Sequence, residues 1–192
     1  MNFFPTAIPE VILIEPRIFA DERGFFLETY RQQQFESAGI IASFVQDNHS
    51  GSYRGALRGL HYQIQQPQGK LVRAVAGEIY DVAVDIRRSS PTFGQWVGLV
   101  LSADNKRQLW VPPGFAHGFL AREDSLVLYG LTQAWDVRLD RAIRWDSPDL
   151  SIDWPLDGAV PIVSVRDRDA PAFGEAEVFD EDGSDGPPAG AR

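Results

Sequence analysis

The sequence contains no cysteine and only one methionine. The absence of cysteine excludes disulfide bonds, thiolate metal ligands and a cysteine nucleophile. No apolar run approaches the ~18 residues that a membrane-spanning helix requires. The first eleven residues carry no basic side chain and include two prolines, which is not typical of a signal peptide. From these absences we expect a cytoplasmic protein.

Basic residues are also in short supply: 18 lysines and arginines face 27 acidic residues, for a net charge of −9. An acidic chain without a basic stripe argues against nucleic acid and anionic membranes as partners. Residues 174–192 hold six of the acids and one arginine, together with several glycines and prolines. We expect one domain over residues 1–173 and a disordered acidic tail over 174–192.

Helical patterns are rare, and period-two alternation of apolar residues predicts strands over Glu78–Ile86, Gln95–Ser102 and Ser125–Leu131. Only Arg31–Ser37, which stops at Gly39, has a clear helical pattern, with a second short helix possible near Ala103–Lys106. About nine or ten strands without intervening helices predict an all-β antiparallel sandwich or barrel. The shorter predicted strands are Val11–Ile14, Gly24–Tyr30, Ser43–Asp47, Ala56–Gln63, Lys70–Ala76 and Leu109–Val111.

Two of the three histidines have unusual neighbours. His61 lies in the apolar strand Leu57–Gln63, and His117 lies in a turn rich in glycine and proline, Pro112–Phe119. A single histidine in an apolar strand is most often a hydrogen-bonded core group. However, three basic residues also occupy strands that would otherwise be buried, and a buried cation needs a counter-charge or a bound anion. A ligand that carries phosphate would satisfy them, because arginine matches phosphate oxygens. These bases are Arg58, Lys70 and Arg73.

Strict alternation along the strand would place Arg58 and His61 on opposite faces, which conflicts with a shared pocket. Gly59 lies between them, and a glycine inside a strand often marks a bulge that shifts the register. We therefore expect a bulge at Gly59 that brings both side chains to one face.

A metal site would require three or four converging ligands. The segment Pro112–His117 is similar to the second motif of the cupin superfamily, but the first motif needs His-x-His followed by glutamate. Here the strand has His61-Tyr62-Gln63, and no glutamate follows before Glu78. We expect a barrel with a histidine pocket and no metal.

Eight long motifs follow one another between residues 6 and 171. They are Asp21–Phe26, Phe44–Ser50, Leu57–Gln63, Gly69–Arg73, Asp81–Arg87, Ser90–Gly94, Arg107–Pro112 and Gly114–Phe119. In sequence and in order, these motifs resemble those of the dTDP-4-dehydrorhamnose 3,5-epimerase family, whose members are metal-free sugar-nucleotide epimerases. This resemblance implies a cupin-type antiparallel jelly-roll barrel with few short helices.

The resemblance implies epimerisation at C3 and C5 of a dTDP-linked 4-keto-6-deoxyhexose without a cofactor, because the substrate's ketone accepts the electrons. His61 would be the base, oriented by Asp167. Lys70 would stabilise the enolate oxygen, and Tyr129 would be the acid that returns a proton from the other side.

The family's binding positions also carry over. Arg166 stands where the family usually has lysine, and Asp140 where it usually has glutamate. In the family, the residues equivalent to Arg23 and Glu28 act across a dimer interface, so the resemblance implies a homodimer. The matched binding residues are Arg23, Glu28, Gln46, Asp47, Asn48, Arg58, His117, Asp140 and Arg166.

One segment departs from the family pattern. After Tyr129 the family usually has Lys-x-Thr-Asp-Tyr-Tyr, and this chain has Gly130–Trp135, with Ala134 and Trp135 in place of the tyrosines. This leaves the nucleotide preference open. Tyr129 itself is present, which favours double epimerisation over a mono-epimerase acting at C3 or C5 only. Two further hypotheses are a metal-dependent cupin enzyme and a non-catalytic sugar-nucleotide binding module.

Overall fold

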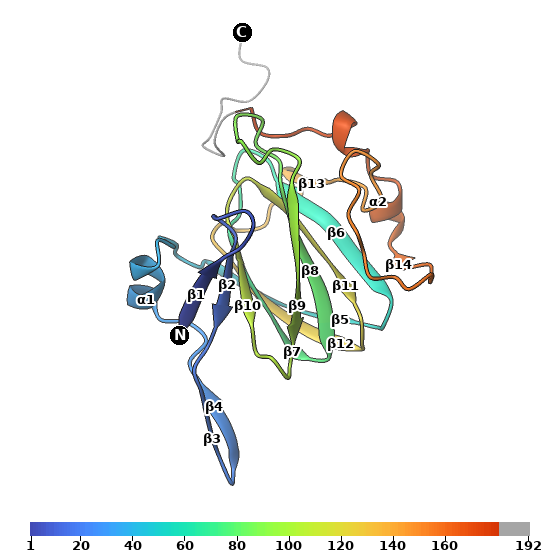
Figure 1. Cartoon of the computed structure of the whole chain (residues 1–192). Coiled ribbons are helices and arrows are strands. Elements are labelled where there is room, and N and C mark those ends of the chain that lie inside the picture. Colours follow the sequence, from blue (N-terminus) through green and yellow to red (C-terminus); the bar gives the residue numbers. More distant parts are fainter. Residues whose placement is uncertain (181–192) are drawn as a thin grey trace.

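The computed structural model describes residues 1–180, and two antiparallel sheets packed face to face make up most of it (Figure 1). We call them the first and second sheets. The first sheet has the strand order β1 (Asn2–Pro5), β2 (Ile12–Glu15), β10 (Gln108–Val111), β7 (Lys70–Ala76), β12 (Ser125–Leu131) and β5 (Gln46–Ser52).

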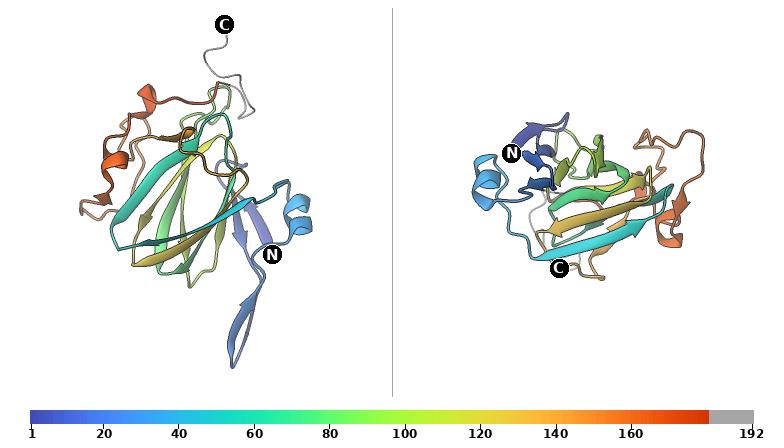
Figure 2. Two further views of the ribbon diagram at one scale, coloured as in Figure 1. Left: turned by 180° about the vertical axis from the view of Figure 1, so that it is seen from behind. Right: turned by 90° about the horizontal axis from the view of Figure 1, so that it is seen from below.

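The second sheet lies opposite the first, and the two layers are seen from below in Figure 2. Its strand order is β13 (Asp140–Ala142), β6 (Ala56–Gln63), β11 (Phe115–Ala121), β8 (Glu78–Asp85) and β9 (Trp96–Ser102). The short strand β14 (Ile162–Val163) pairs with β6 in the parallel direction. The cupin-type β fold expected from the sequence is confirmed.

Three smaller elements lie outside the sheets. A hairpin of β3 (Ile18–Asp21) and β4 (Gly24–Leu27) projects away from the body of the molecule (Figure 1). Helix α1 (Gln32–Ser37) follows it and confirms the helix predicted there. Helix α2 (Val165–Arg168) and a 3₁₀ turn (Phe173–Glu175) belong to the C-terminal segment that runs beside β6 (Figure 1).

Two hydrophobic clusters hold the layers together, and they define the inner and outer faces of the sheets. The cluster between the sheets combines side chains from both, and it includes Val72, Ala83, Phe115, Phe119 and Val127. A second cluster covers the outer face of the second sheet with side chains of the C-terminal segment, such as Trp154 and Phe179. Because apolar area is buried on both faces of the second sheet, its strands β8 and β11 are almost fully enclosed.

Strand β11 corrects one expectation from the sequence. We expected Pro112–Phe119 to be a turn, but only its first part turns, and Phe115–Ala121 is a strand with all seven residues buried. A strand covered on both faces shows no alternation, so nothing in its pattern distinguishes it from the preceding turn. The possible helix near Ala103–Lys106 is also wrong, because this segment is a hydrogen-bonded turn between β9 and β10.

The last described residues pack on the second sheet. Ala176, Val178 and Phe179 are buried, and the Phe179 amide donates to the Ile86 carbonyl. These residues belong to the stretch that we expected to be a tail, 174–192. The rest of the expected tail, 181–192, lies outside the described residues. Within residues 1–180, no helix combines the length and apolarity needed to cross a membrane.

Candidate active site

A bulge in β6 brings Arg58 and His61 to the inner face of the second sheet. His61 pairs with His117 of β11, and Arg58 pairs with Phe119, so three steps along β6 match two steps along β11. The extra residue shifts the alternation by one. Both side chains therefore face the same way as Phe119, which packs between the sheets. The expected bulge is present.

Gly59 is the residue that makes this bulge possible. Its φ angle is +122°, a conformation that side-chain-bearing residues rarely adopt. A Cβ atom at this position would lie 2.5 Å from the Cα atom of Gly118 on the neighbouring strand. Both the backbone angle and the close contact with β11 therefore require glycine.

Asp167 binds the imidazole of His61. Its Oδ1 atom lies 2.6 Å from His61 Nε2, and its Oδ2 atom accepts a hydrogen bond from the Gly59 amide at 3.3 Å. Asp167 sits in the first turn of α2, where the Ser164 hydroxyl accepts from its backbone amide. Burial alone would raise the pKa of Asp167, but hydrogen bonds from His61, Gly59 and Ser164 hold it below its usual range. The carboxylate stays charged and keeps the imidazole in place.

Lys70 is buried beside the histidine at the start of β7. It is 6% exposed, and its Nζ atom donates to the backbone carbonyl of His61 at 3.1 Å. Burial lowers the pKa of Lys70 to about 8, although the nearby carboxylates of Asp140 and Asp81 oppose the shift. The protein therefore keeps this amine next to His61 although burial disfavours its charged form.

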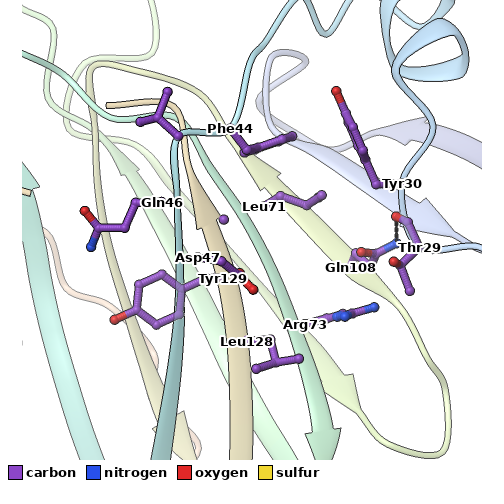
Figure 3. Close-up of a pocket in the computed structure, with 12 residues that line it drawn as sticks. Thr29, Tyr30, Phe44, Gln46, Asp47, Leu71, Arg73, Gln108, Leu128 and Tyr129 are labelled. Carbon is purple, nitrogen blue, oxygen red and sulfur yellow. Dashed lines mark hydrogen bonds between the residues drawn. The ribbon is translucent and has the colours of Figure 1, made fainter. Parts of the chain in front are cut away.

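Tyr129 comes from the opposite sheet. On β12 it pairs with Asn48 and Val72, and Val72 belongs to the cluster between the sheets, so Tyr129 shares the inner face. In Figure 3 its ring points away from Tyr30 and Arg73, which lie on the outer face. Burial raises the pKa of the phenol, while the charge of Arg58 and a hydrogen bond from Asn48 oppose the rise.

His117 forms a second imidazole–carboxylate pair. Its Nε2 atom lies 2.9 Å from Asp81 Oδ1, and both residues are buried. Sequence reasoning missed Asp81. The available signal was a carboxylate on one face of the alternating strand β8, because a charge in such a position needs a partner.

Two arginines also lie near His61 and Asp167. The Arg58 guanidinium donates to the Ser52 hydroxyl at 2.9 Å and to the Gly51 carbonyl at 2.8 Å. Arg166 forms a 2.8 Å ion pair with Asp140. Together with His61 and Asp167, Arg58 and Arg166 line a cavity of about 450 Å³ between β6 and the C-terminal segment.

Four residues that we considered have side chains away from the inner faces of the sheets. Asp47 and Arg73 are on the outer face of the first sheet, where they line a separate cavity of about 410 Å³ that Gln46 and Tyr129 also border (Figure 3). Arg23 is at the tip of the projecting hairpin and pairs with Asp21, while Glu28 pairs with Arg31 after the hairpin. A single chain therefore does not bring these side chains to the cavity, and Arg73 does not share a cavity with Arg58 and His61.

Metal ligands do not cluster in the described part of the chain. Within residues 1–180, no three histidine, aspartate or glutamate side chains come together in a way that could hold a metal ion. His61 and His117 each bind a different carboxylate instead.

Comparison with known proteins identifies the family. The model of the dTDP-4-dehydrorhamnose 3,5-epimerase family matches residues 5–175. A dTDP-4-dehydrorhamnose 3,5-epimerase from Pseudomonas aeruginosa is 61% identical over 175 residues, covering 90% of this chain and 96% of the relative.

Solved structures agree with this result. An epimerase from Legionella pneumophila, in complex with dTDP-4-keto-L-rhamnose, has a TM-score of 0.90 and 47% identity, covering 93% of this chain and 97% of the other. ChmJ, a 3'-monoepimerase from Streptomyces bikiniensis in complex with dTDP-quinovose, has a TM-score of 0.82 and 33% identity, covering 88% and 87%. The chain belongs to the dTDP-4-dehydrorhamnose 3,5-epimerase family.

Proposed function

We propose that this protein is an isomerase that converts dTDP-4-dehydro-6-deoxy-D-glucose to dTDP-4-dehydro-L-rhamnose by inverting C3 and C5. The observation that carries the proposal is the pair of opposed groups on the inner faces of the two sheets. A histidine bound to a buried carboxylate, His61 with Asp167, lies on the second sheet. A phenol, Tyr129, lies on the first sheet.

His61 would act as the base. The C4 ketone makes the hydrogens on C3 and C5 acidic, and a neutral imidazole can remove one of them, release that proton to solvent and then remove the other. Asp167 then stabilises the imidazolium that forms and keeps the ring from turning. Proton removal leaves an enolate whose negative charge collects on the C4 oxygen, so the reaction needs no cofactor as an electron acceptor.

Lys70 would stabilise that enolate. It is a buried ammonium group, and its contact with the His61 carbonyl keeps it next to the base. A charge placed in a water-poor site stabilises a developing oxyanion more strongly than the same charge in water.

Tyr129 would donate the new proton from the opposite face. Its hydroxyl gives up a proton to the carbon, the enolate returns to a ketone, and the phenolate regains a proton from solvent. Inversion requires an acid across the ring from the base, and this role is supported by the location of Tyr129 and His61 on the inner faces of different sheets.

The binding roles rest on charge and location. Arg58 and Arg166 border the cavity and fit the diphosphate, because a guanidinium can bind two phosphate oxygens at once. Gln46, Asn48 and His117 would bind the sugar and nucleoside. Asp140, held by Arg166, would set the charge near Lys70.

A homodimer is part of the proposal, as is a cytoplasmic location. The hairpin exposes Phe19, Phe25 and Phe26, which are between 49% and 69% exposed as residues, and a second copy could cover them. Arg23 and Glu28 lie on or beside this hairpin and would then reach the partner's cavity. Asp47 would contribute through its backbone, since its side chain faces outward.

The runner-up is a mono-epimerase, favoured by the similarity to ChmJ at a lower identity. NMR of the reaction with dTDP-4-keto-6-deoxyglucose in heavy water separates the two. We expect deuterium at both C3 and C5, and deuterium at one carbon only would establish the runner-up. A repeat with a chelator and an elemental analysis tests the metal-dependent hypothesis, and complete absence of exchange would leave only a binding module.

A further inference from the structure

A short rim segment, Thr132–Asp136, follows the strand that carries Tyr129, and glutamine side chains hold its backbone. The Gln63 Nε2 atom donates to the Ala134 carbonyl at 3.2 Å, and Gln63 Oε1 accepts from the Asp136 amide at 2.8 Å. Gln68 donates to the Gln133 carbonyl at 3.1 Å. Gln63 is 1% exposed and lies two residues after the base, so it joins the base's strand to the segment that follows the acid's strand.

The amide of Trp135, at the centre of the rim segment, starts a chain of hydrogen bonds. It donates to Gln46 Oε1 at 2.9 Å, and Gln46 Nε2 donates to Asn48 Oδ1 at 2.9 Å. Asn48 in turn pairs with Tyr129 across β5 and β12 and is hydrogen-bonded to its phenol. The chain therefore runs from the rim segment to the proposed acid.

A backbone amide can only donate, and this fixes the direction of every bond in the chain. The atom of Gln46 that faces Trp135 must be its oxygen, so the nitrogen faces Asn48. Asn48 must then present its oxygen to Gln46, which leaves its NH₂ group for Tyr129. The phenol oxygen therefore accepts a hydrogen bond and does not have to donate its own hydrogen to the protein.

We propose that Gln63, Gln46 and Asn48 form a relay that holds the Tyr129 oxygen as a hydrogen-bond acceptor and leaves its hydrogen free to be donated on the inner face of the first sheet. Gln63 is a positioning residue in this relay, because it fixes the backbone on both sides of Trp135 without reaching the cavity. The inference rests on the proposed function, since it concerns proton donation by Tyr129. It also explains why a buried strand ends in a glutamine whose amide bonds are all used by backbone groups.

The test is carried out in heavy water and measures two rates: incorporation of deuterium at C3 and C5, and formation of epimerised product. The readout is the ratio of product formed to deuterium incorporated. Gln63→Met removes the bonds to Ala134 and Asp136 while keeping a side chain of similar length. We expect proton abstraction by His61 to continue and KM to stay unchanged. The amount of product formed per exchange event should fall about tenfold. This is a smaller effect than the 10²–10⁴-fold loss of rate expected when general acid catalysis is lost completely.

Gln46→Glu tests the direction of the bonds. One carboxylate oxygen can still accept from Trp135, but the other cannot donate to Asn48. The Asn48 amide must turn over, and its oxygen then binds the hydroxyl hydrogen of Tyr129. We expect a larger fall in product per exchange event than Gln63→Met causes, together with any change in KM that the loss of a substrate contact brings.

Ser125→Ala is the matched control. Ser125 is buried at the other end of β12, where its hydroxyl donates to the carbonyls of Glu78 and Glu123. It should lower Tm and leave the product ratio at the wild-type value. A wild-type ratio in folded Gln63→Met, or in Gln46→Glu if the first variant does not fold, overturns the relay. Absence of exchange in the wild type overturns the proposed function itself, and with it the relay.

Discussion

Arg58 and His61 face the same side of β6, because the strand carries one extra residue between them at Gly59. A group suited to phosphate and a group suited to proton removal therefore border one cavity. The spacing between these two side chains sets how far the reacting carbons lie from the diphosphate, so the bulge is a geometric requirement of the proposed reaction.

Gly59→Ala should disrupt this arrangement. The new methyl group would meet Gly118 on β11, and the φ angle of +122° adds backbone strain. We expect a loss of about 3 kcal/mol in the free energy of unfolding, with loss of activity in whatever folded protein remains. Gly55→Ala is the control, because Gly55 also has a positive φ but nothing lies within 4 Å of the added Cβ. Denaturant unfolding that gives equal losses for both would contradict the steric argument.

His61→Ala should abolish deuterium exchange at both carbons while the fold persists. His61 is partly exposed and contributes little to the core, whereas removal of a general base typically costs 10²–10⁴ in rate. Exchange is measured by NMR and folding by circular dichroism. Asp167→Asn should cause a smaller loss of the same kind, and exchange at the wild-type rate in the alanine variant would remove His61 from its role.

Tyr129→Phe should separate proton removal from proton return. The phenyl ring keeps the packing against the inner cluster, but it has no proton to donate. We expect substrate hydrogens to exchange with heavy water at an undiminished rate and little product to form. The product-to-exchange ratio is the measurement, and a ratio equal to that of the wild type would show that another group is the acid.

Deprotonation of Lys70 should limit activity at high pH. Its pKa in the folded chain is about 8, so the enolate loses its counter-charge as the pH rises through this value and kcat/KM falls. Arginine stays charged in this pH range. In Lys70→Arg we therefore expect a lower kcat/KM than in the wild type, but no fall in kcat/KM as the pH rises through about 8. An alkaline limb that persists in the arginine variant would assign the titration to another group.

The same shift has an opposite effect on stability. Because the folded chain binds the Lys70 proton less tightly than the unfolded chain, whose lysine has a pKa of 10.5, the free energy of unfolding should rise with pH between about 8 and 10.5. Urea titrations at several pH values measure this slope for the wild type and for Lys70→Met, in which this contribution should be absent.

The hairpin residues should control assembly. Phe26→Asp places a charge on an exposed apolar surface that the proposed dimer would cover, so the mass in analytical ultracentrifugation should fall from dimer to monomer. Activity should fall with it, because Arg23 and Glu28 would no longer reach a partner's cavity. Val160→Asp is a control on a separate exposed apolar residue, and an equal effect on mass would contradict a specific role for the hairpin.

Strands with a clear pattern could be predicted closely, and others could not. The bounds of β6, β7 and β12 match the prediction, because their apolar residues lie between clear turns. Strand β5 was predicted at Ser43–Asp47 but covers Gln46–Ser52, since its polar sequence contains no apolar residue. The two-residue β14 is too short to carry a pattern.

Site residues that belong to sequence motifs could be predicted. Hydrogen-bond partners that come from strands far apart in the sequence could not. Together, the resemblance to the family and the bulge at Gly59 indicated His61, Arg58 and Lys70. The pairing of Asp81 with His117 depends on the alignment of β8 with β11, which a single sequence does not specify. The outward direction of the Asp47 side chain likewise depends on strand pairing. Asp47 lies opposite Gly130, one residue along from the pair Asn48 and Tyr129, so its side chain is on the other face of the sheet.

Asp167 reaches His61 from 106 positions further along the chain. During synthesis the base therefore emerges from the ribosome long before its carboxylate. Every described strand precedes Asp167 in the chain, so both sheets can be synthesised while the histidine still has no partner. In the proposed reaction, a product truncated before Asp167 that still forms the sandwich would not consume the sugar nucleotide.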